Sequence, residues 1–193
     1  MILIYNRDMK SKIRVIIFDF IGVLLFTKVT YKPNKIIDEI DQVIGKVTND
    51  KLFKKELIKK YNLKEKEFDK ILNKIVNKYE SFKPLWKLLP SLKKKYKLAI
   101  INNGTSLTLK EFKRKYNIDE FFNLFISSAI EGVRKPNSDI YKLATLKLGV
   151  KPKECLFMDD SLPNINGAKN FGMKTIYWEN PNIGFKKFKE FLK

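Results

Sequence analysis

Short apolar runs alternate with amphipathic segments along most of this chain, and this alternation limits the possible folds more than any other feature. Five runs rich in β-branched and aromatic residues have the length and composition of buried strands: residues 13–18, 98–101, 124–127, 156–158 and 174–177. Segments with helical periodicity precede, separate or follow the last four runs: residues 83–96, 107–116, 138–148, 165–171 and 185–192. This order predicts an α/β fold with a doubly wound parallel sheet and right-handed crossovers.

The stretch between about residue 31 and residue 81 breaks the alternation. It has no strand pattern, and its Lys, Leu and Ile residues recur at helical spacing. Three helices are predicted there, over residues 34–47, 50–61 and 64–79. Pro33 and Pro84 lie near the two ends of the stretch. We therefore expect two domains: a Rossmann-like core formed by residues 1–28 and 82–193, and an inserted small α-helical cap at 29–81.

Two residue counts limit the chemistry. Histidine is absent, and cysteine occurs once, at Cys155. Without histidine, Ser-His-Asp and Cys-His nucleophilic sites and nearly every catalytic zinc site are excluded. A single cysteine excludes an internal disulfide and a cysteine-rich metal cluster. Catalysis would therefore depend on carboxylates, amides, lysine or a bound hard cation.

The net charge of +19 raises the question of a polyanionic partner. Residues 51–97 hold 16 Lys and 5 Asp or Glu, and so contribute +11 of that charge. Arg is scarce and no basic stripe alternates with aromatics, so the lysines are more typical of a solvated face, and nucleic acid is a minor hypothesis. No apolar stretch approaches the roughly 20 residues of a membrane span. We expect a cytoplasmic protein, with residues 1–11 as an edge strand or a lead-in.

Candidate site residues follow four of the predicted strands, three times directly and once, after residues 124–127, a few residues later. In chain order they are Asp19, then Asn102, Asn103 and Gly104, then Lys135, and then Asp159 and Asp160. Each residue alone is explained by a turn or a helix cap. However, ligands of open parallel sheets bind at the carboxyl ends of the strands. Four sets of polar residues at one sheet edge therefore predict a single pocket.

The motifs around these residues resemble those of the haloacid dehalogenase superfamily of hydrolases over nearly the whole chain. Residues 18–24 resemble its first motif, apolar-Asp-x-Asp-Gly-Val/Thr-Leu, and residues 102–104 resemble the second, Ser/Thr followed by Asn-Gly. Residues 132–136 match Gly-x-x-Lys-Pro, and residues 159–173 match Asp-Asp-x-x-x-Asn followed by Ala and Gly-Met. A helical insertion after the first motif is also similar to the small-capped branch of that superfamily.

The resemblance implies a hydrolase that acts on small phosphorylated molecules with Mg²⁺ as its cofactor. Asp19 would be the nucleophile and would form an aspartyl-phosphate. The resemblance places Mg²⁺ on Asp19, Asp159 and the backbone carbonyl of Ile21, with Asp160 orienting its waters. Magnesium would cancel the repulsion between the carboxylate and the phosphate dianion.

The resemblance gives the remaining candidates roles at the phosphate group. Lys135 would stabilise negative charge on the nucleophile and the phosphoryl oxygens. Asn102, Asn103 and Gly104, together with Lys135, would bind the phosphate. Asn102 stands where the superfamily has a hydroxyl residue, and its amide can still donate a hydrogen bond.

Ile21 is the main departure from the superfamily pattern. Phosphatases of the superfamily carry at this position a second Asp, the general acid/base, and such catalysis contributes about 10²–10⁴ in rate. The chain is therefore expected to be a phosphatase with weakened turnover, or one whose cap supplies the acid/base. A catalytically impaired protein that binds a phosphorylated ligand or a protein partner is the alternative. Dehalogenase-like chemistry also dispenses with this Asp, although Asp159 and Asp160 retain a metal pattern that it does not require. The substrate stays open, and the expected assembly is a monomer or homodimer.

Overall fold

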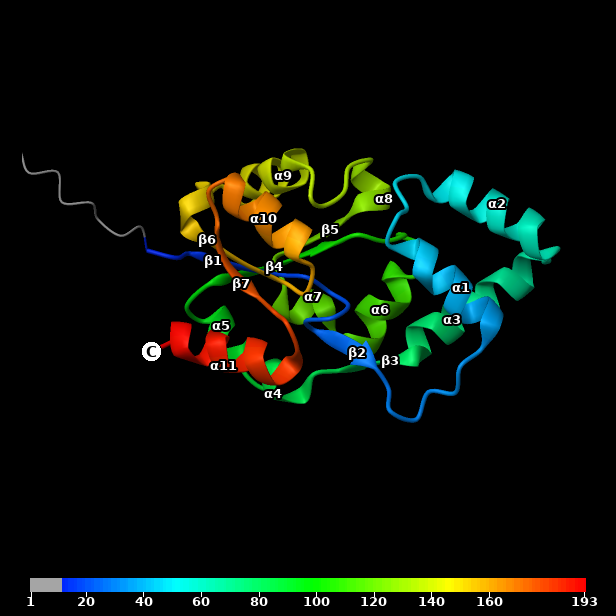
Figure 1. The fold of residues 1–193 in the computed structure, drawn as a ribbon, viewed down its shortest axis with the longest axis horizontal. Helices are drawn as coiled ribbons and strands as arrows, with labels where there is room; N and C mark the ends of the chain where they lie inside the picture. Colours follow the sequence, from blue (N-terminus) through cyan, green and yellow to red (C-terminus); the bar gives the residue numbers. More distant parts are fainter. Residues whose placement is uncertain (1–11) are drawn as a thin grey trace, which may run out of the picture.

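The structure is a computed structural model that describes residues 12–193, so the prediction for residues 1–11 lies outside the described residues. Its centre is a parallel five-stranded sheet in the order β5-β4-β1-β6-β7 (Figure 1). The strands are β1 (Val15–Phe18), β4 (Lys97–Asn102), β5 (Leu124–Ser127), β6 (Cys155–Asp159) and β7 (Lys174–Tyr177). β1 is central, because Phe18 pairs with Ile100 on one side and with Met158 on the other. The predicted doubly wound α/β fold is confirmed.

Helices bury both faces of the sheet, which is why its strands are continuously apolar. The four residues of β1 are fully buried: Ile16 and Phe18 belong to one core cluster, and Val15 and Ile17 to the other. The first cluster is completed by α4 (Lys83–Trp86), α5 (Leu89–Lys93), α6 (Leu109–Tyr116), α7 (Ile118–Phe121) and α11 (Pro181–Phe191). The second is completed by α9 (Ser138–Leu148) and α10 (Leu162–Asn170). Within residues 12–193 no helix has the length and apolarity needed to cross a membrane.

Residues 29–81, called the insert below, form three helices beside the core (Figure 1). These are α1 (Lys35–Ile44), α2 (Asp50–Tyr61) and α3 (Glu65–Lys78). Asn34 and Asn49 begin the first two, because their side chains accept hydrogen bonds from the free backbone N–H groups of the first turns. Phe53 and Phe68 pack edge to face between α2 and α3. The three predicted helices are present, and α1 ends at Ile44, before the predicted residue 47.

A short antiparallel ribbon joins the insert to the core, and the sequence did not indicate it. It pairs β2 (Leu25–Thr27) with β3 (Tyr79–Ser81), so that Leu25 lies opposite Ser81 and Thr27 opposite Tyr79. The expectation of no strand up to residue 81 is therefore wrong. Strands of three residues are too short to show a period-two pattern.

The single helix predicted over residues 83–96 is also wrong, because two short helices, α4 and α5, occupy that stretch. Pro90 lies in the first turn of α5. A proline ring has no N–H to donate and collides with the carbonyl four residues earlier, here that of Trp86. A continuous helix through this point is therefore disfavoured, and a new helix, α5, begins at Leu89.

Candidate active site

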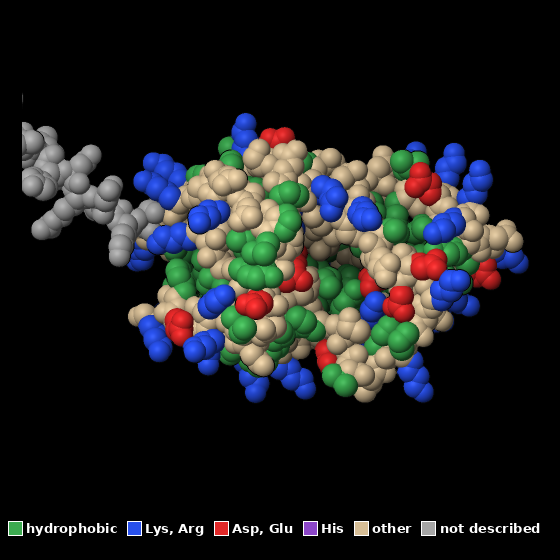
Figure 2. Space-filling model, viewed as in Figure 1, with side chains coloured by type: hydrophobic (Ala, Val, Ile, Leu, Met, Phe, Trp, Pro, Cys, Tyr) green, Lys and Arg blue, Asp and Glu red, His purple; other side chains and the backbone are tan. Residues whose placement is uncertain are grey.

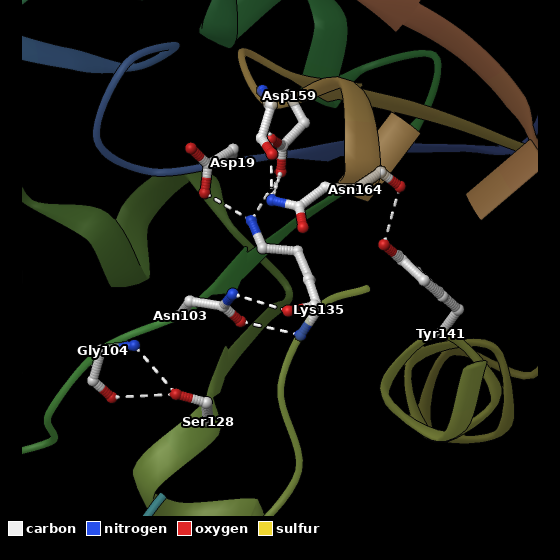
Figure 3. A network of polar contacts seen from close by, with 9 residues as sticks. Asp19, Asn103, Gly104, Ser128, Lys135, Tyr141, Asp159 and Asn164 are labelled. Carbon is white, nitrogen blue, oxygen red and sulfur yellow. Dashed lines mark hydrogen bonds and ion pairs between the residues drawn. The ribbon is translucent and has the colours of Figure 1, made fainter. Parts of the chain in front are cut away.

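The sheet brings the predicted site residues to one edge, where the parallel strands end (Figure 3). Asp19 follows β1, Asn102 ends β4 and Asp159 ends β6. Lys135 reaches the same edge on the loop between the short helix α8 (Ser128–Glu131) and α9. Among residues 12–193 only three charged residues are buried, and they are Asp19, Lys135 and Asp159. Burying charge is costly, so their shared location marks a site.

Lys135 lies between the two buried carboxylates. Its Nζ is 2.5 Å from Asp19 Oδ1 and 2.7 Å from Asp159 Oδ2, and its side chain is 1% exposed. Burial disfavours the ammonium form, but the charges of Asp19 and Asp159 outweigh that effect and raise the pKa of Lys135 above its ordinary value. Lys135 is therefore a cation fixed against Asp19, and its role in stabilising charge during a reaction stays a prediction.

Asn103 fixes the backbone of Lys135. Its side-chain amide donates to the Lys135 carbonyl (2.9 Å) and accepts from the Lys135 N–H (2.8 Å). Gly104 donates its N–H to Ser128 Oγ (2.9 Å), and the sequence analysis did not identify Ser128 as a neighbour of the site. Asn102 and Asn103 line the cavity described below, whereas Gly104 does not. The phosphate-binding roles of Asn102, Asn103 and Gly104 stay predictions, and Asn103 has in addition a positioning role.

Three carboxylates form a group that fits a divalent cation. One oxygen each of Asp19, Asp159 and Asp160 lies within 4.8 Å of the others. Asp159 is held by the N–H of Ser161 (2.8 Å) and by Asn164 Nδ2 (3.0 Å). If all three carboxylates are ionised, Lys135 leaves two negative charges uncompensated. Oxygen donors with excess negative charge are the environment that Mg²⁺ prefers.

The turn after Asp19 is compatible with the predicted backbone ligand. Leu24 and Leu25 donate to the Phe20 carbonyl, and Gly22 donates to the Leu25 carbonyl, so these bonds do not use the carbonyl of Ile21. Gly22 has φ +102°, and a Cβ there would lie 2.2 Å from Asp160 Oδ2. Glycine is therefore required for Asp160 to approach the turn.

A cavity of about 250 Å³ adjoins this group. The core contributes Asp19, Phe20, Ile21, Asn102, Asn103, Thr108, Phe112, Lys135 and Asn164 to its lining. The insert contributes Asp41, Gln42, Ile44, Gly45, Ile75 and Tyr79. Figure 2 shows Asp and Glu side chains on both sides of the hollow between the core and the insert. Sequence reasoning named none of the insert residues, because they belong to no motif.

Asn164 also lines the cavity, and the sequence analysis assigned it no role. Figure 3 shows its amide directed at Asp159, and its backbone carbonyl accepts a hydrogen bond from the buried Tyr141 hydroxyl (2.8 Å). The Asp-Asp-x-x-x-Asn motif contained this signal, because the spacing puts Asn164 in the first turn of α10, facing back to the end of β6. Asn164 therefore orients a carboxylate of the group.

The buried state of Asp19 leads to a prediction on stability. Burial raises the pKa of the Asp19 carboxyl, the ammonium group of Lys135 opposes this increase, and Asp159 and Asp160 add to it, which leaves the pKa at about 7 against an ordinary 3.8. Well below pH 4 the carboxyl is neutral in both the folded and the unfolded chain. Between about pH 4 and pH 7 the unfolded chain ionises while the folded chain keeps its proton, so stability is lost over this range, and the loss is complete above about pH 7. In EDTA, Asp19→Asn should therefore raise the melting temperature at pH 8 and change it little at pH 4.

The exposed Asp69 provides the matched control, since Asp69→Asn removes the same charge outside the site. Melting temperatures of the three proteins at pH 4, 6 and 8 give the measurement. A difference between Asp19→Asn and the unmodified protein that is constant over this range would contradict the prediction.

Comparison with known proteins places these residues in context. The sequence profile of haloacid dehalogenase-like hydrolases matches residues 13–172. The glyceraldehyde 3-phosphate phosphatase of Pyrococcus furiosus is 39% identical over 95 residues, which is 48% of this chain and 40% of that protein. The pyrophosphatase PpaX of Bacillus cereus is 28% identical over 184 residues, which is 85% of this chain and 82% of that protein. The Pyrococcus furiosus enzyme and two other glyceraldehyde 3-phosphate phosphatases, from Pyrococcus abyssi and Methanopyrus kandleri, match over 40%, 36% and 45% of their own lengths, so the chain spans less than half of each.

Solved structures show the same fold. A HAD-family enzyme of Bacteroides thetaiotaomicron, solved as its magnesium complex, superposes with a TM-score of 0.72. It is 20% identical, and the match covers 94% of this chain and 99% of that one. The correspondence extends over the insert as well as the sheet, because so little of either chain is left out.

Proposed function

The chain belongs to the family of haloacid dehalogenase-like hydrolases, and from this premise we propose that it is a Mg²⁺-dependent phosphatase of small phosphorylated molecules. Its nucleophile is Asp19, and Ile21 lowers its turnover. One observation carries the proposal: the buried Lys135 ammonium contacts both Asp19 and Asp159, beside a third carboxylate and a cavity. Relatives named as phosphatases support the substrate class.

The proposed reaction uses the chain's own residues in two steps. An oxygen of Asp19 attacks phosphorus, the bond between phosphorus and the leaving oxygen breaks, the leaving oxygen takes a proton from solvent, and an aspartyl-phosphate forms. Water then attacks this phosphorus and gives a proton to solvent, the bond between phosphorus and the Asp19 oxygen breaks, and inorganic phosphate leaves, which restores the carboxylate. Lys135 holds Asp19 in place and remains a cation next to the transferred phosphoryl oxygens. Asn103 contributes indirectly, because it fixes the Lys135 backbone.

The residues present also fit the proposed metal. Asp19, Asp159 and the Ile21 carbonyl would hold Mg²⁺, and Asp160 would orient its waters. When bound, the ion supplies positive charge that offsets the repulsion between carboxylate and phosphate. A magnesium complex of a structural relative supports this choice of metal.

Hydrolysis of 4-nitrophenyl phosphate with and without Mg²⁺ tests the proposed function. We expect turnover with Mg²⁺ and a loss of at least about 10²-fold in EDTA, because the carboxylate group then repels the phosphate. Refilling with Mg²⁺ should restore the rate, and 4-nitrophenyl acetate controls for general esterase activity. Turnover that EDTA leaves unchanged would refute the metal dependence. Chloride release from 2-chloropropionate without phosphate hydrolysis would instead establish dehalogenase-like chemistry.

A catalytically impaired binding protein is the second candidate, and Ile21 is the observation that favours it. Ile21 lines the cavity where the first motif of this family carries an acid/base, and its side chain cannot transfer a proton. Phosphate binding without detectable turnover would identify this candidate. The two candidate functions share one site and differ only in the rate at which that site hydrolyses a phosphate ester.

Nucleic-acid binding gains little from the structure. A basic hollow lies at the opposite end of the sheet, where β1 and β4 begin, with Arg14, Lys93 and Lys97 in its lining. These three side chains bond to the chain itself, Arg14 to Glu154 and the two lysines to backbone carbonyls. Of the six basic residues in this lining, which also include Lys12, Lys94 and Lys95, Arg14 is paired with a carboxylate; nucleic-acid binding stays a minor hypothesis.

A further inference from the structure

The insert places a negative charge at its end of the cavity, although the chain as a whole carries +19. We propose that Asp41 determines specificity: it accepts a hydrogen bond from a hydroxyl or ammonium group of the substrate and excludes substrates that carry a second anionic group. The inference rests on the proposed phosphatase site and names its substrate class. That class is short, hydroxylated or amino-bearing monophosphates.

Asp41 is held firmly in the wall of the cavity. Its Oδ2 accepts hydrogen bonds from Tyr79 Oη (2.5 Å) and from Lys78 Nζ (2.7 Å). Its side chain is 12% exposed, and it lines the cavity together with Tyr79. Both bonds go to the same oxygen, and among the described residues Oδ1 accepts none. A carboxylate oxygen has lone pairs and no proton, so the group that pairs with Oδ1 must be a donor.

The charges around Asp41 do not cancel. Lys78 Nζ is also 2.9 Å from Asp38 Oδ1, so one ammonium group serves two carboxylates. Tyr31 donates a neutral hydroxyl to Asp38 (2.8 Å) and adds no charge. The group therefore has a net charge of −1 when both carboxylates are ionised. A substrate carboxylate or second phosphate placed here would meet a like charge on a side chain that is mostly buried.

The other cavity walls and its volume limit the rest of the substrate. Ile44, Ile75 and Phe112 give the cavity an apolar wall suited to a carbon chain. Its volume of about 250 Å³ lies below the roughly 300–1,000 Å³ of pockets for drug-sized ligands. A phosphoryl group beside Lys135 leaves room for only a short chain. One phosphate, a few carbons and a donor for Asp41 complete the description.

Calorimetric binding of two non-hydrolysable phosphonates tests the inference without any need for turnover. The probes are 2-hydroxyethylphosphonate and phosphonoacetate, which differ in a hydroxyl against a carboxylate, in the presence of Mg²⁺. We expect the unmodified protein to bind the hydroxyl compound at least about 10-fold more tightly. In Asp41→Asn this ratio should fall at least about 10-fold, because the like charge is removed.

Two further variants make the result specific. Asp38→Asn is the matched control, since Asp38 bonds to the same Lys78 but does not line the cavity, and the ratio should fall clearly less than in Asp41→Asn. Gln42→Glu adds a charge to the cavity wall and should increase the ratio, so it tests the inference even if Asp41→Asn fails to fold. An equal ratio in the unmodified protein, Asp41→Asn and Gln42→Glu would overturn the inference, as would an equal fall in Asp38→Asn and Asp41→Asn, or no binding of either probe.

The proposed function and this inference can fail separately. If 4-nitrophenyl phosphate is not hydrolysed but the ratio still falls in Asp41→Asn, the specificity of the site stands and the phosphatase does not. If the ester is hydrolysed while the ratio of the two phosphonate affinities is the same in Asp41→Asn, Gln42→Glu and the unmodified protein, the phosphatase stands and the role of Asp41 is refuted.

Discussion

Asp19→Asn is expected to lower Mg²⁺-dependent hydrolysis of 4-nitrophenyl phosphate by at least about 10³-fold, because no other described carboxylate that lines the cavity contacts Lys135. The cavity's second described carboxylate, Asp41, is bonded to Lys78 and Tyr79 instead. Asp159 is buried, hydrogen-bonded to Ser161 and Asn164, and absent from the cavity lining. Asp160 is exposed and also lies outside that lining. The measurement is the initial rate, and mass spectrometry of the quenched reaction should find phosphate on the peptide that contains residue 19.

Asp19→Glu controls for charge, since it keeps the carboxylate and moves it by one methylene group. We expect it to be nearly as inactive, because Lys135 holds Asp19 Oδ1 at 2.5 Å and a cavity of about 250 Å³ leaves little room to adjust. Asp69→Asn should retain the full rate. Turnover within about 10-fold of normal in Asp19→Asn would remove the proposed nucleophile.

Ile21→Asp is expected to raise the same turnover by about 10²-fold, within the range of 10²–10⁴ that general acid–base catalysis supplies. Ile21 is half-buried and lines the cavity, so a carboxyl there would be able to reach the leaving oxygen and then water. The gain should be larger for alkyl phosphates than for 4-nitrophenyl phosphate, because a poor leaving group depends more on a proton donor. The rates with the two ester types provide the measurement.

Ile21→Asn is the matched control, because an Asn side chain has nearly the same shape as an Asp side chain and is also polar, but it cannot transfer a proton. An equal gain in both variants would mean that polarity matters at this position, and proton transfer does not. No gain in Ile21→Asp, with folding and Mg²⁺ binding intact, would show that the rate is limited elsewhere. The structure also sets a cost: a fourth carboxylate beside Asp19, Asp159 and Asp160 should lower the melting temperature in EDTA.

The sheet was predictable because its strands are buried on both faces. Residues 124–127 and 174–177 match β5 and β7 at both ends, and β1, β4 and β6 differ only at their ends. Two of the misplaced helix starts have a common cause in proline. Pro163 and Pro181 lie in the first turns of α10 and α11, which begin before the predicted residues 165 and 185.

The site was predictable only where strand ends, or the connections that leave them, carry it. Asp19 and Asp159 could be placed together because they lie at the ends of two paired strands, and Lys135 because its loop follows β5 at the same edge of the sheet. Asp41 and Tyr79 could not, because their approach to the cavity depends on how the insert packs on the core. The second role of Asn103 was hidden for a similar reason, since its bonds to Lys135 join positions 32 residues apart.

The central place of β1 in the sheet also determines when the site can form during synthesis. Asp19 and Lys135 are 116 positions apart, and β6, which completes the carboxylate group, begins at Cys155. During synthesis, Asp19 therefore leaves the ribosome well before Lys135 and Asp159 have been added to the chain. Until β6 has been made, one edge of β1 lacks its partner strand. A nascent chain that ends before residue 155 therefore has the first motif but cannot form the carboxylate group, which includes Asp159 and Asp160.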